Sequence, residues 1–238
     1  MSRIVEVLAD KSTLIERSQS IILDRLETAI ASRDQFTIAL SGGSTPKPLY
    51  QSLASLSLPW EKIHIFWGDE RYVAATDPDS NQLMARQAWL DQVSIPADNI
   101  HPMNTTSDDP VKDAKLHETE LQHFFQTQPG EIPVFDLILL GMGDDGHTAS
   151  LFPHTDALTV RDSLVTVGNK DGQPRLTFTV PLINQARCVL FVVAGASKRP
   201  VLKQVFAAEG DEMNYPSRLI APQGELFWLL DQAAGEEI

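Results

Sequence analysis

The sequence contains a single cysteine, Cys188, and few basic residues. One cysteine cannot form a disulfide within the chain, and its place in the apolar run CVLFVVAG indicates a buried, unreactive thiol that suits a reducing compartment. The 238 residues include 19 Lys and Arg against 32 Asp and Glu, a formal net charge of −13. Such a charge repels nucleic acid and anionic membrane surfaces, which proteins bind mainly through clustered Lys and Arg. We therefore expect neither nucleic acid nor membrane as a partner.

Long apolar runs are also missing. No window approaches the roughly 18 apolar residues of a membrane span, and the N-terminal segment lacks the basic and apolar pattern of a signal peptide. The sequence therefore predicts a soluble protein of the cytoplasm. A chain of this length buries roughly 70–75% of the surface that it exposes when unfolded, so its core needs no disulfide for stability.

Short apolar runs alternate with amphipathic stretches along the whole chain. This pattern is typical of an α/β fold in which a mostly parallel, Rossmann-like sheet is flanked by helices. Because we find no linker, repeat or low-complexity segment, we expect one domain over residues 1–238. The expected strands are 3–8, 36–40, 62–67, 135–140, 163–167, 175–180, 188–194 and 225–230. We expect the last of them to close the sheet.

Helix starts and one turn are marked by polar residues, proline and glycine. We expect helices to begin at Pro46, after Ser80 as an N-cap, and at Asp109-Pro110. Ser197 is expected to cap a further helix. The run NKDGQP predicts a turn between the strands 163–167 and 175–180.

In an open α/β sheet, ligands bind beyond the carboxyl ends of the strands, and four of the expected strands end in unusual polar loops. The first loop consists of Ser41, Gly42, Gly43, Ser44 and Thr45, followed by a helix. Two glycines let the backbone approach a ligand, and the free N–H groups at a helix N-terminus favour an anion. An ordinary strand-to-helix turn rarely needs two glycines between hydroxyls. We therefore predict that this loop binds an anionic group.

Two further loops supply cations. The segment WGDERYV, at the end of the strand 62–67, contains Asp69 and Arg71, and GASK, after the strand 188–194, ends in Lys198. Because an acidic chain needs a local cationic pocket to hold an anion, these loops are candidates for the site. Arg175 begins its expected strand rather than ending it, so the pattern alone does not place it in the site.

The fourth loop, GMGDDGH, contains a candidate catalytic pair. It matches the dinucleotide fingerprint G-x-G-x-x-G, but two aspartates stand where a pyrophosphate must approach the backbone, and no convincing helix and strand follow. His147 ends the loop, with Asp145 two residues before it. An imidazole suits proton transfer near neutral pH, and a carboxylate can orient its ring. The other histidines lack metal-ligand spacing, so we expect neither a metal nor an organic cofactor.

With these residues in view, the chain closely resembles the 6-phosphogluconolactonases, which are related to the glucosamine-6-phosphate deaminases and isomerases. The matching segments occur in the family's order and are LSGGSTPKPLY, WGDERYV, DSN, GMGDDGHTASLFP, PRLTFT and GASK. The resemblance implies a glucosamine-6-phosphate-deaminase-like fold without metal or cofactor. It also implies the reaction, which is hydrolysis of 6-phosphogluconolactone, a small sugar-phosphate lactone of the oxidative pentose phosphate pathway.

The same resemblance implies a role for each candidate residue. His147 is the general base that activates water against the lactone carbonyl, and Asp145 orients it. The loop 41–45 lines the pocket that holds the substrate phosphate. The cations expected around this phosphate are Arg71, Arg175 and Lys198.

Two other functions share parts of this pattern. A glucosamine-6-phosphate deaminase or isomerase has the phosphate loop and the D-G-H element, but there an Asn-Glu-Pro element follows, whereas here Phe152 takes the place of the glutamate. Asp69, matched to a catalytic acid or base in the deaminases, is expected here to be a hydrogen-bonding partner of Arg71. A non-catalytic sugar-phosphate sensor needs a DNA-binding segment, for which the chain has neither spare length nor a basic patch.

Overall fold

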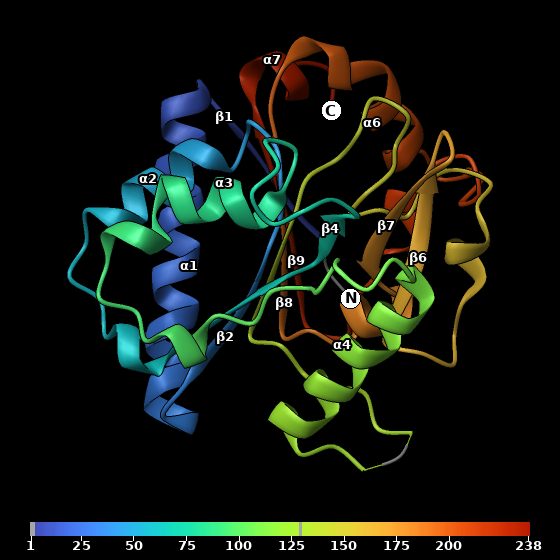
Figure 1. Ribbon diagram of the computed structural model, residues 1–238. Helices are drawn as coiled ribbons and strands as arrows, with labels where there is room; N and C mark the ends of the chain where they lie inside the picture. The colour runs from blue at the N-terminus through green and yellow to red at the C-terminus, as the bar shows by residue number, and fades with distance from the viewer. Residues whose placement is uncertain (1–2, 129) are drawn as a thin grey trace.

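The computed structural model describes residues 3–128 and 130–238, and a parallel sheet runs through the middle of this part of the chain (Figure 1). Its strands are β1 (Arg3–Leu8), β2 (Phe36–Leu40), β3 (Ile63–Trp67), β5 (Leu137–Leu140), β8 (Cys188–Val193) and β9 (Glu225–Asp231). The strand order is β1-β9-β8-β5-β2-β3, and every neighbouring pair is parallel. The predicted α/β fold is therefore confirmed. The expectation that the last strand closes the sheet is wrong, because β9 lies between β8 and β1.

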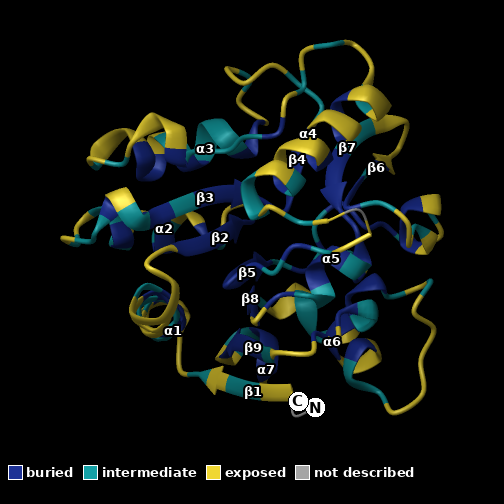
Figure 2. Cartoon of the chain, turned by 90° about the horizontal axis from the view of Figure 1, so that it is seen from below, coloured by how far each residue is buried: buried dark blue, intermediate teal, exposed yellow. Residues whose placement is uncertain are grey.

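Helices cover both faces of this sheet. They are α1 (Lys11–Arg33), α2 (Lys47–Ala54), α3 (Asn81–Ala88), α4 (Pro110–Phe125), α5 (Val180–Asn184), α6 (Arg199–Phe206) and α7 (Gln232–Gly235). Figure 2 shows α1, α2 and α3 on one face of the sheet and α5 and α6 on the other. Within the described residues, no helix is long and apolar enough to span a bilayer.

The strands in the middle of the sheet are buried on both faces. Leu137 and Leu139 of β5 belong to the same apolar cluster as the buried residues of α1, whereas Ile138 and Leu140 belong to the cluster on the opposite face. This alternation follows from the two-residue period of a strand, whose successive side chains point to opposite faces. The continuous apolar runs of the sequence are therefore the central strands of a sheet covered on both sides.

Three helix starts agree with the prediction and one does not. Pro46 directly precedes the first residue of α2. The Ser80 side chain accepts a hydrogen bond from the Leu83 N–H (3.1 Å), and Asp109 caps α4. Ser197 is not a cap, because it lies in the 3-10 helix Ala196–Lys198 and α6 begins after it. Its hydroxyl instead donates to Asp144 (3.2 Å).

A second, antiparallel sheet stands beside the main one. Its strands are β4 (Asp69–Arg71), β7 (Gln173–Phe178) and β6 (Val165–Lys170), in the order β4-β7-β6. The predicted turn between the last two strands is shorter than expected, because β6 and β7 extend into the run NKDGQP. Only Asp171 and Gly172 remain between the strands, both with positive φ (53° and 84°), as a tight hairpin requires.

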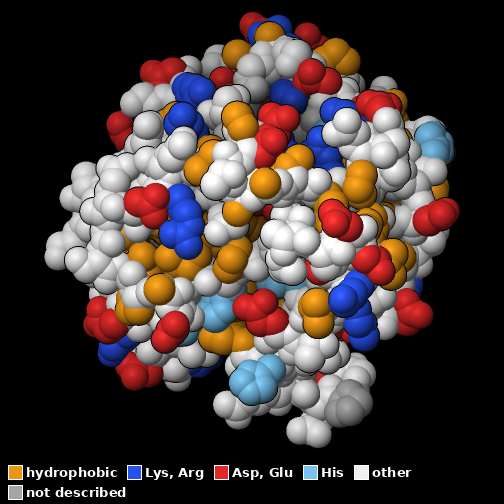
Figure 3. All heavy atoms as spheres, viewed as in Figure 1, with side chains coloured by type: hydrophobic (Ala, Val, Ile, Leu, Met, Phe, Trp, Pro, Cys, Tyr) orange, Lys and Arg blue, Asp and Glu red, His pale blue; other side chains and the backbone are white. Residues whose placement is uncertain are grey.

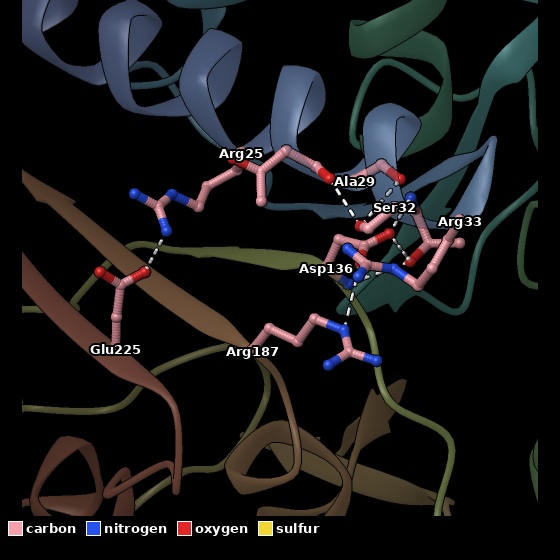
Figure 4. A network of polar contacts seen from close by, with 9 residues as sticks. Arg25, Ala29, Ser32, Arg33, Asp136, Arg187 and Glu225 are labelled. Carbon is pink, nitrogen blue, oxygen red and sulfur yellow. Dashed lines mark hydrogen bonds and ion pairs between the residues drawn. The ribbon is translucent and has the colours of Figure 1, made fainter.

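A buried carboxylate joins the N-terminal ends of β2 and β5, at the end of the sheet opposite the polar loops (Figure 4). Asp136 is 5% exposed and accepts hydrogen bonds from the Thr37 N–H (2.9 Å) and hydroxyl (3.0 Å). The guanidinium of Arg33 donates to its other oxygen (2.8 Å), and that of Arg187 lies 3.4 Å from the same atom. One carboxylate thus fixes two strands and two arginines.

We expect Asp136→Ala to lower the free energy of unfolding by about 2–4 kcal/mol, because it leaves the buried Thr37 N–H without an acceptor and two cations without a partner. Urea denaturation measures this difference. Arg86→Ala is the control, since it removes an exposed ion pair with Asp91 and should change stability by less than about 0.5 kcal/mol. Equal effects of the two substitutions would contradict a structural role for Asp136.

Charged side chains of both signs are interspersed over the face of the molecule in Figure 3, with hydrophobic side chains scattered between them. Acidic groups lie next to the basic groups on this face. No continuous basic patch of the kind that binds nucleic acid is visible there.

Candidate active site

The four polar loops of the sequence follow the adjacent strands β8, β5, β2 and β3. Because these strands are parallel, all four loops lie at one edge of the sheet. From β2 the chain continues to the neighbour on one side, β3, and from β5 to the neighbour on the other side, β8, so the strand order reverses between β2 and β5. Ligands of α/β sheets bind at such a switch point.

A pocket of about 250 Å³ occupies this place. Its walls contain every residue predicted for the site except Asp145, which is hydrogen-bonded to His147. The predicted residues that line it are Ser41, Gly42, Gly43, Ser44, Thr45, Asp69, Arg71, His147, Arg175 and Lys198. The structure therefore brings together residues that are up to 157 positions apart in the chain, from Ser41 to Lys198.

The loop 41–45 forms part of the pocket wall. Tyr50 of α2 holds the start of the loop, since its hydroxyl donates to the Ser41 carbonyl (2.7 Å) and accepts from the Ser41 N–H (3.1 Å). Gly43 has a φ of 99°, which favours glycine. The N–H groups of residues 42–45 have no acceptor among the described residues. Four free donors before a helix form a site suited to an anion.

Arg71 and Arg175 form a cationic wall of the pocket. They are direct cross-strand partners in the antiparallel pair of β4 and β7, so their side chains lie on one face of the second sheet. The Nε–H groups of both are buried, with no acceptor among the described residues. Burial, and then the charge of Arg71, lower the pKa of Arg175. Two adjacent guanidinium groups with unused donors favour a bound anion.

Lys198 completes the cationic side of the pocket. Gly195, with a φ of 101°, turns the chain from β8 into the 3-10 helix that ends at Lys198. The lysine ammonium forms an ion pair with Asp144 (2.7 Å), and this ammonium holds the pKa of Asp144 below its usual range. Asp144 thereby links the loop after β5 to the loop after β8.

His147 and Asp145 form a hydrogen-bonded pair at the end of β5. The Nδ1 atom of His147 lies 2.5 Å from Asp145 Oδ1, which also accepts from the His147 N–H (3.1 Å). Burial raises the pKa of Asp145, but the hydrogen bond to His147, the charge of its ring and the backbone donors lower it further, to about 2. The carboxylate is therefore ionised near neutral pH and accepts a hydrogen bond from the Nδ1–H group of His147. This tautomer leaves Nε2 of His147 free to act as a base.

An apolar ring separates His147 from the cationic wall. The Phe152 ring centroid is 4.4 Å from that of the His147 imidazole, and the Arg175 guanidinium carbon is 5.5 Å from the Phe152 centroid. Phe152 is 5% exposed. Its ring thus contacts both the candidate base and a candidate phosphate-binding arginine.

Asp69 lines the pocket, but its predicted pairing with Arg71 is wrong. Asp69 Oδ2 accepts a hydrogen bond from the buried Ser150 hydroxyl (2.6 Å). Arg71 donates instead to the backbone carbonyl of Asp79 (2.6 Å). The two side chains alternate in β4 with Glu70, so they share a face of the strand without bonding to each other.

Gly143 leaves the space that the His147 ring occupies. A Cβ atom built on Gly143 would lie 2.1 Å from His147 Nδ1 and 2.6 Å from Asp145 Oδ1. We expect Gly143→Ala to displace the imidazole from its carboxylate and to lower kcat about 10-fold, because catalysis depends on ångström-scale placement of the base. Steady-state kinetics together with a thermal melt test this. An unchanged kcat in a folded variant would show that this geometry is not required.

Sequence reasoning gave no role to two residues near the pocket. Asn81 lines it, and Glu70 lies buried behind it. The signal was present, since Asn81 belongs to the matching segment DSN and Glu70 to WGDERYV. Across residues 3–128 and 130–238, no three His, Cys, Asp or Glu side chains are grouped so that they could hold a metal ion.

Comparison with known proteins places this geometry in a family. Residues 9–228 match the family model for glucosamine-6-phosphate isomerases and 6-phosphogluconolactonase. A 6-phosphogluconolactonase of Synechocystis sp. is 66% identical over 98% of both chains. The solved structure of a 6-phosphogluconolactonase from Trypanosoma cruzi superposes with a TM-score of 0.90 at 32% identity, covering 100% of this chain and 97% of the other.

A monomeric glucosamine-6-phosphate deaminase shares the fold. Its structure superposes with a TM-score of 0.83, covering 98% of this chain and 99% of the other, at 18% identity. The expectation of a deaminase-like fold is thus confirmed.

Proposed function

This chain belongs to the family of glucosamine-6-phosphate isomerases and 6-phosphogluconolactonases, and from that premise we propose that it hydrolyses 6-phosphogluconolactone with His147 as the general base. The product is 6-phosphogluconate, as in the oxidative part of the pentose phosphate pathway. One domain over residues 1–238 carries the whole site.

The observation that carries the proposed mechanism is the pair of His147 and Asp145 at the pocket wall. Because the ionised carboxylate holds the proton on Nδ1, Nε2 of His147 can take a proton from water. The resulting hydroxide attacks the carbonyl carbon of the lactone, and the carbonyl oxygen becomes the oxyanion of a tetrahedral intermediate. When this intermediate collapses, the bond between the carbonyl carbon and the ring oxygen breaks. The ring oxygen then takes the proton from His147 and becomes a free hydroxyl. The new carboxylic acid loses its own proton to solvent near neutral pH and becomes a carboxylate.

The cationic residues of the pocket suit the substrate phosphate. Arg71, Arg175 and Lys198 supply positive charge there, and the loop 41–45 supplies backbone donors. Fixing the phosphate at these residues holds the lactone ring beside His147. Such positioning converts an encounter in solution into a reaction within one complex. Because a lactone is an activated ester, one base and a positioned water suffice for its hydrolysis.

Phe152 favours hydrolysis over the deaminase reaction. Its ring packs against His147, at the place where the deaminases that this chain resembles carry a glutamate. Aldose–ketose isomerisation moves protons at several atoms, and a phenyl ring can neither give nor take one. Hydrolysis requires a single activated water.

Parallel assays on two substrates test the proposed function. The purified chain should open freshly prepared 6-phosphogluconolactone rapidly and release no ammonia from glucosamine 6-phosphate. Both substrates carry the same phosphate, so binding at the cationic wall is matched and only the chemistry differs. Ammonia release at a rate comparable to lactone opening would overturn the assignment.

A further inference from the structure

Asn81 has a buried hydrogen-bond acceptor with no donor in the part of the chain that the structure describes. The residue is 1% exposed, lies at the first position of α3 and lines the pocket. Its Oδ1 atom is buried and has no donor among the described residues. An unpaired buried polar atom is costly, so it indicates a partner that arrives from outside the chain.

The orientation of this amide is fixed by its surroundings. Asn81 Nδ2 donates to the Asp69 carbonyl (2.9 Å), and turning the amide over would place two oxygens against each other. The backbone is held as well, because the buried Glu70 carboxylate accepts from the Asn81 N–H (2.7 Å), the Gln82 N–H (2.7 Å) and the Ser80 hydroxyl (3.1 Å). Oδ1 is therefore the free end of a rigid group.

The anion-binding loop leaves room for this acceptor. A Cβ atom built on Gly42 would lie 1.8 Å from Asn81 Oδ1, although the backbone of Gly42 is not in the left-handed region. Glycine is thus required at position 42 because a side chain there would clash with the Asn81 amide, and not because of the backbone conformation. Oδ1 lies where the loop 41–45 meets the wall formed by β4 and α3.

The chemistry of the lactone decides what this acceptor can bind. The phosphate dianion, the lactone carbonyl and the ring oxygen accept hydrogen bonds but donate none, so the only donors on the substrate are its hydroxyl groups at C2, C3 and C4. We propose that Asn81 Oδ1 accepts a hydrogen bond from one of these ring hydroxyls and thereby selects for a hydroxylated sugar lactone. This inference rests on the proposed lactonase function.

The test compares kcat/KM for four substrates, namely 6-phosphogluconolactone and its 2-deoxy, 3-deoxy and 4-deoxy analogues. Asn81→Leu keeps the size of the side chain and removes the acceptor. We expect it to lower kcat/KM about 10- to 100-fold for the parent lactone, because a buried hydroxyl loses its partner. For one deoxy analogue, wild type and variant should have equal kcat/KM values, since the hydroxyl that Asn81 contacts is absent from it. A loss by the same factor on all four substrates, or no loss, would refute the proposal.

Two further variants keep this test decisive. Gly42→Ala should displace Asn81 Oδ1 and show the same dependence on the same missing hydroxyl, even if Asn81→Leu does not fold. Asn99→Leu is the matched control, since Asn99 is buried outside the pocket with its amide donating to three backbone carbonyls. The ratio of kcat/KM for Asn99→Leu to kcat/KM for wild type should be the same for all four substrates. If the wild-type chain hydrolyses none of the lactones, the proposed function itself fails, which is a separate outcome.

Discussion

His147→Ala should lower kcat for hydrolysis of 6-phosphogluconolactone by about 10²–10⁴-fold, the usual range for the loss of a general base. In the proposed mechanism Nε2 of His147 is the base, because Asp145 accepts the hydrogen bond from Nδ1–H. KM should change little, since in the proposed mechanism His147 acts on the attacking water and not on the phosphate. The spontaneous opening of the lactone sets the floor of the measurement and has to be subtracted at each substrate concentration.

An exposed histidine far from the pocket provides the matched control for this substitution. His123 lies in the last turn of α4 and is not part of the pocket wall. His123→Ala should therefore leave kcat unchanged. A His147→Ala variant that folds and keeps a near-normal kcat would remove this residue from the mechanism.

Removing Arg175 or Lys198 should weaken binding of the phosphorylated lactone by about 10- to 100-fold, the equivalent of roughly 1.5–3 kcal/mol for a hydrogen bond to a charged group. We expect the larger effect for Arg175, whose Nε–H has no acceptor among the described residues, whereas Lys198 already pairs with Asp144. For unphosphorylated gluconolactone, the binding constants of wild type and either variant should differ little, because this substrate lacks the phosphate that we propose these cations bind.

Lys203→Ala is the control for a lost positive charge. Lys203 lies on α6 and pairs with Glu237, outside the pocket wall. The Lys203→Ala substitution should change the binding of neither the phosphorylated nor the unphosphorylated lactone. If the Arg175 and Lys198 variants lost affinity equally for phosphorylated and unphosphorylated lactone, these residues would instead serve the fold or the chemical step.

The sequence predicted the parts of the site that depend on strand ends. Apolar runs mark the buried strands, and a polar loop after each of four strands predicts a common edge once the strands are parallel. The pair of His147 and Asp145 is only two residues apart, so local chain geometry brings the side chains together. The predicted place of β9 at the end of the sheet was wrong, because β1, from the other end of the chain, pairs with its free side.

The parts that depend on the second sheet could not be predicted from periodicity. β4 has three residues, too few to show an alternating pattern, and its pairing with β7 is what places Arg175 opposite Arg71. The same pairing fixes the Asp69 backbone that holds Asn81. The cap predicted at Ser197 is wrong, although a serine before a helix is a frequent cap, because its hydroxyl donates to Asp144 instead.

The initial rate of 6-phosphogluconolactone hydrolysis, measured on the purified chain after dialysis against a chelator, tests the central claim most directly. Arg71, Arg175 and Lys198 line the pocket and disfavour a bound cation, so the protein groups alone should carry the reaction. We predict a rate far above that of spontaneous opening and unchanged by the chelator. A rate equal to the spontaneous one, or a loss restored by a divalent ion, would contradict hydrolysis by His147 in this pocket.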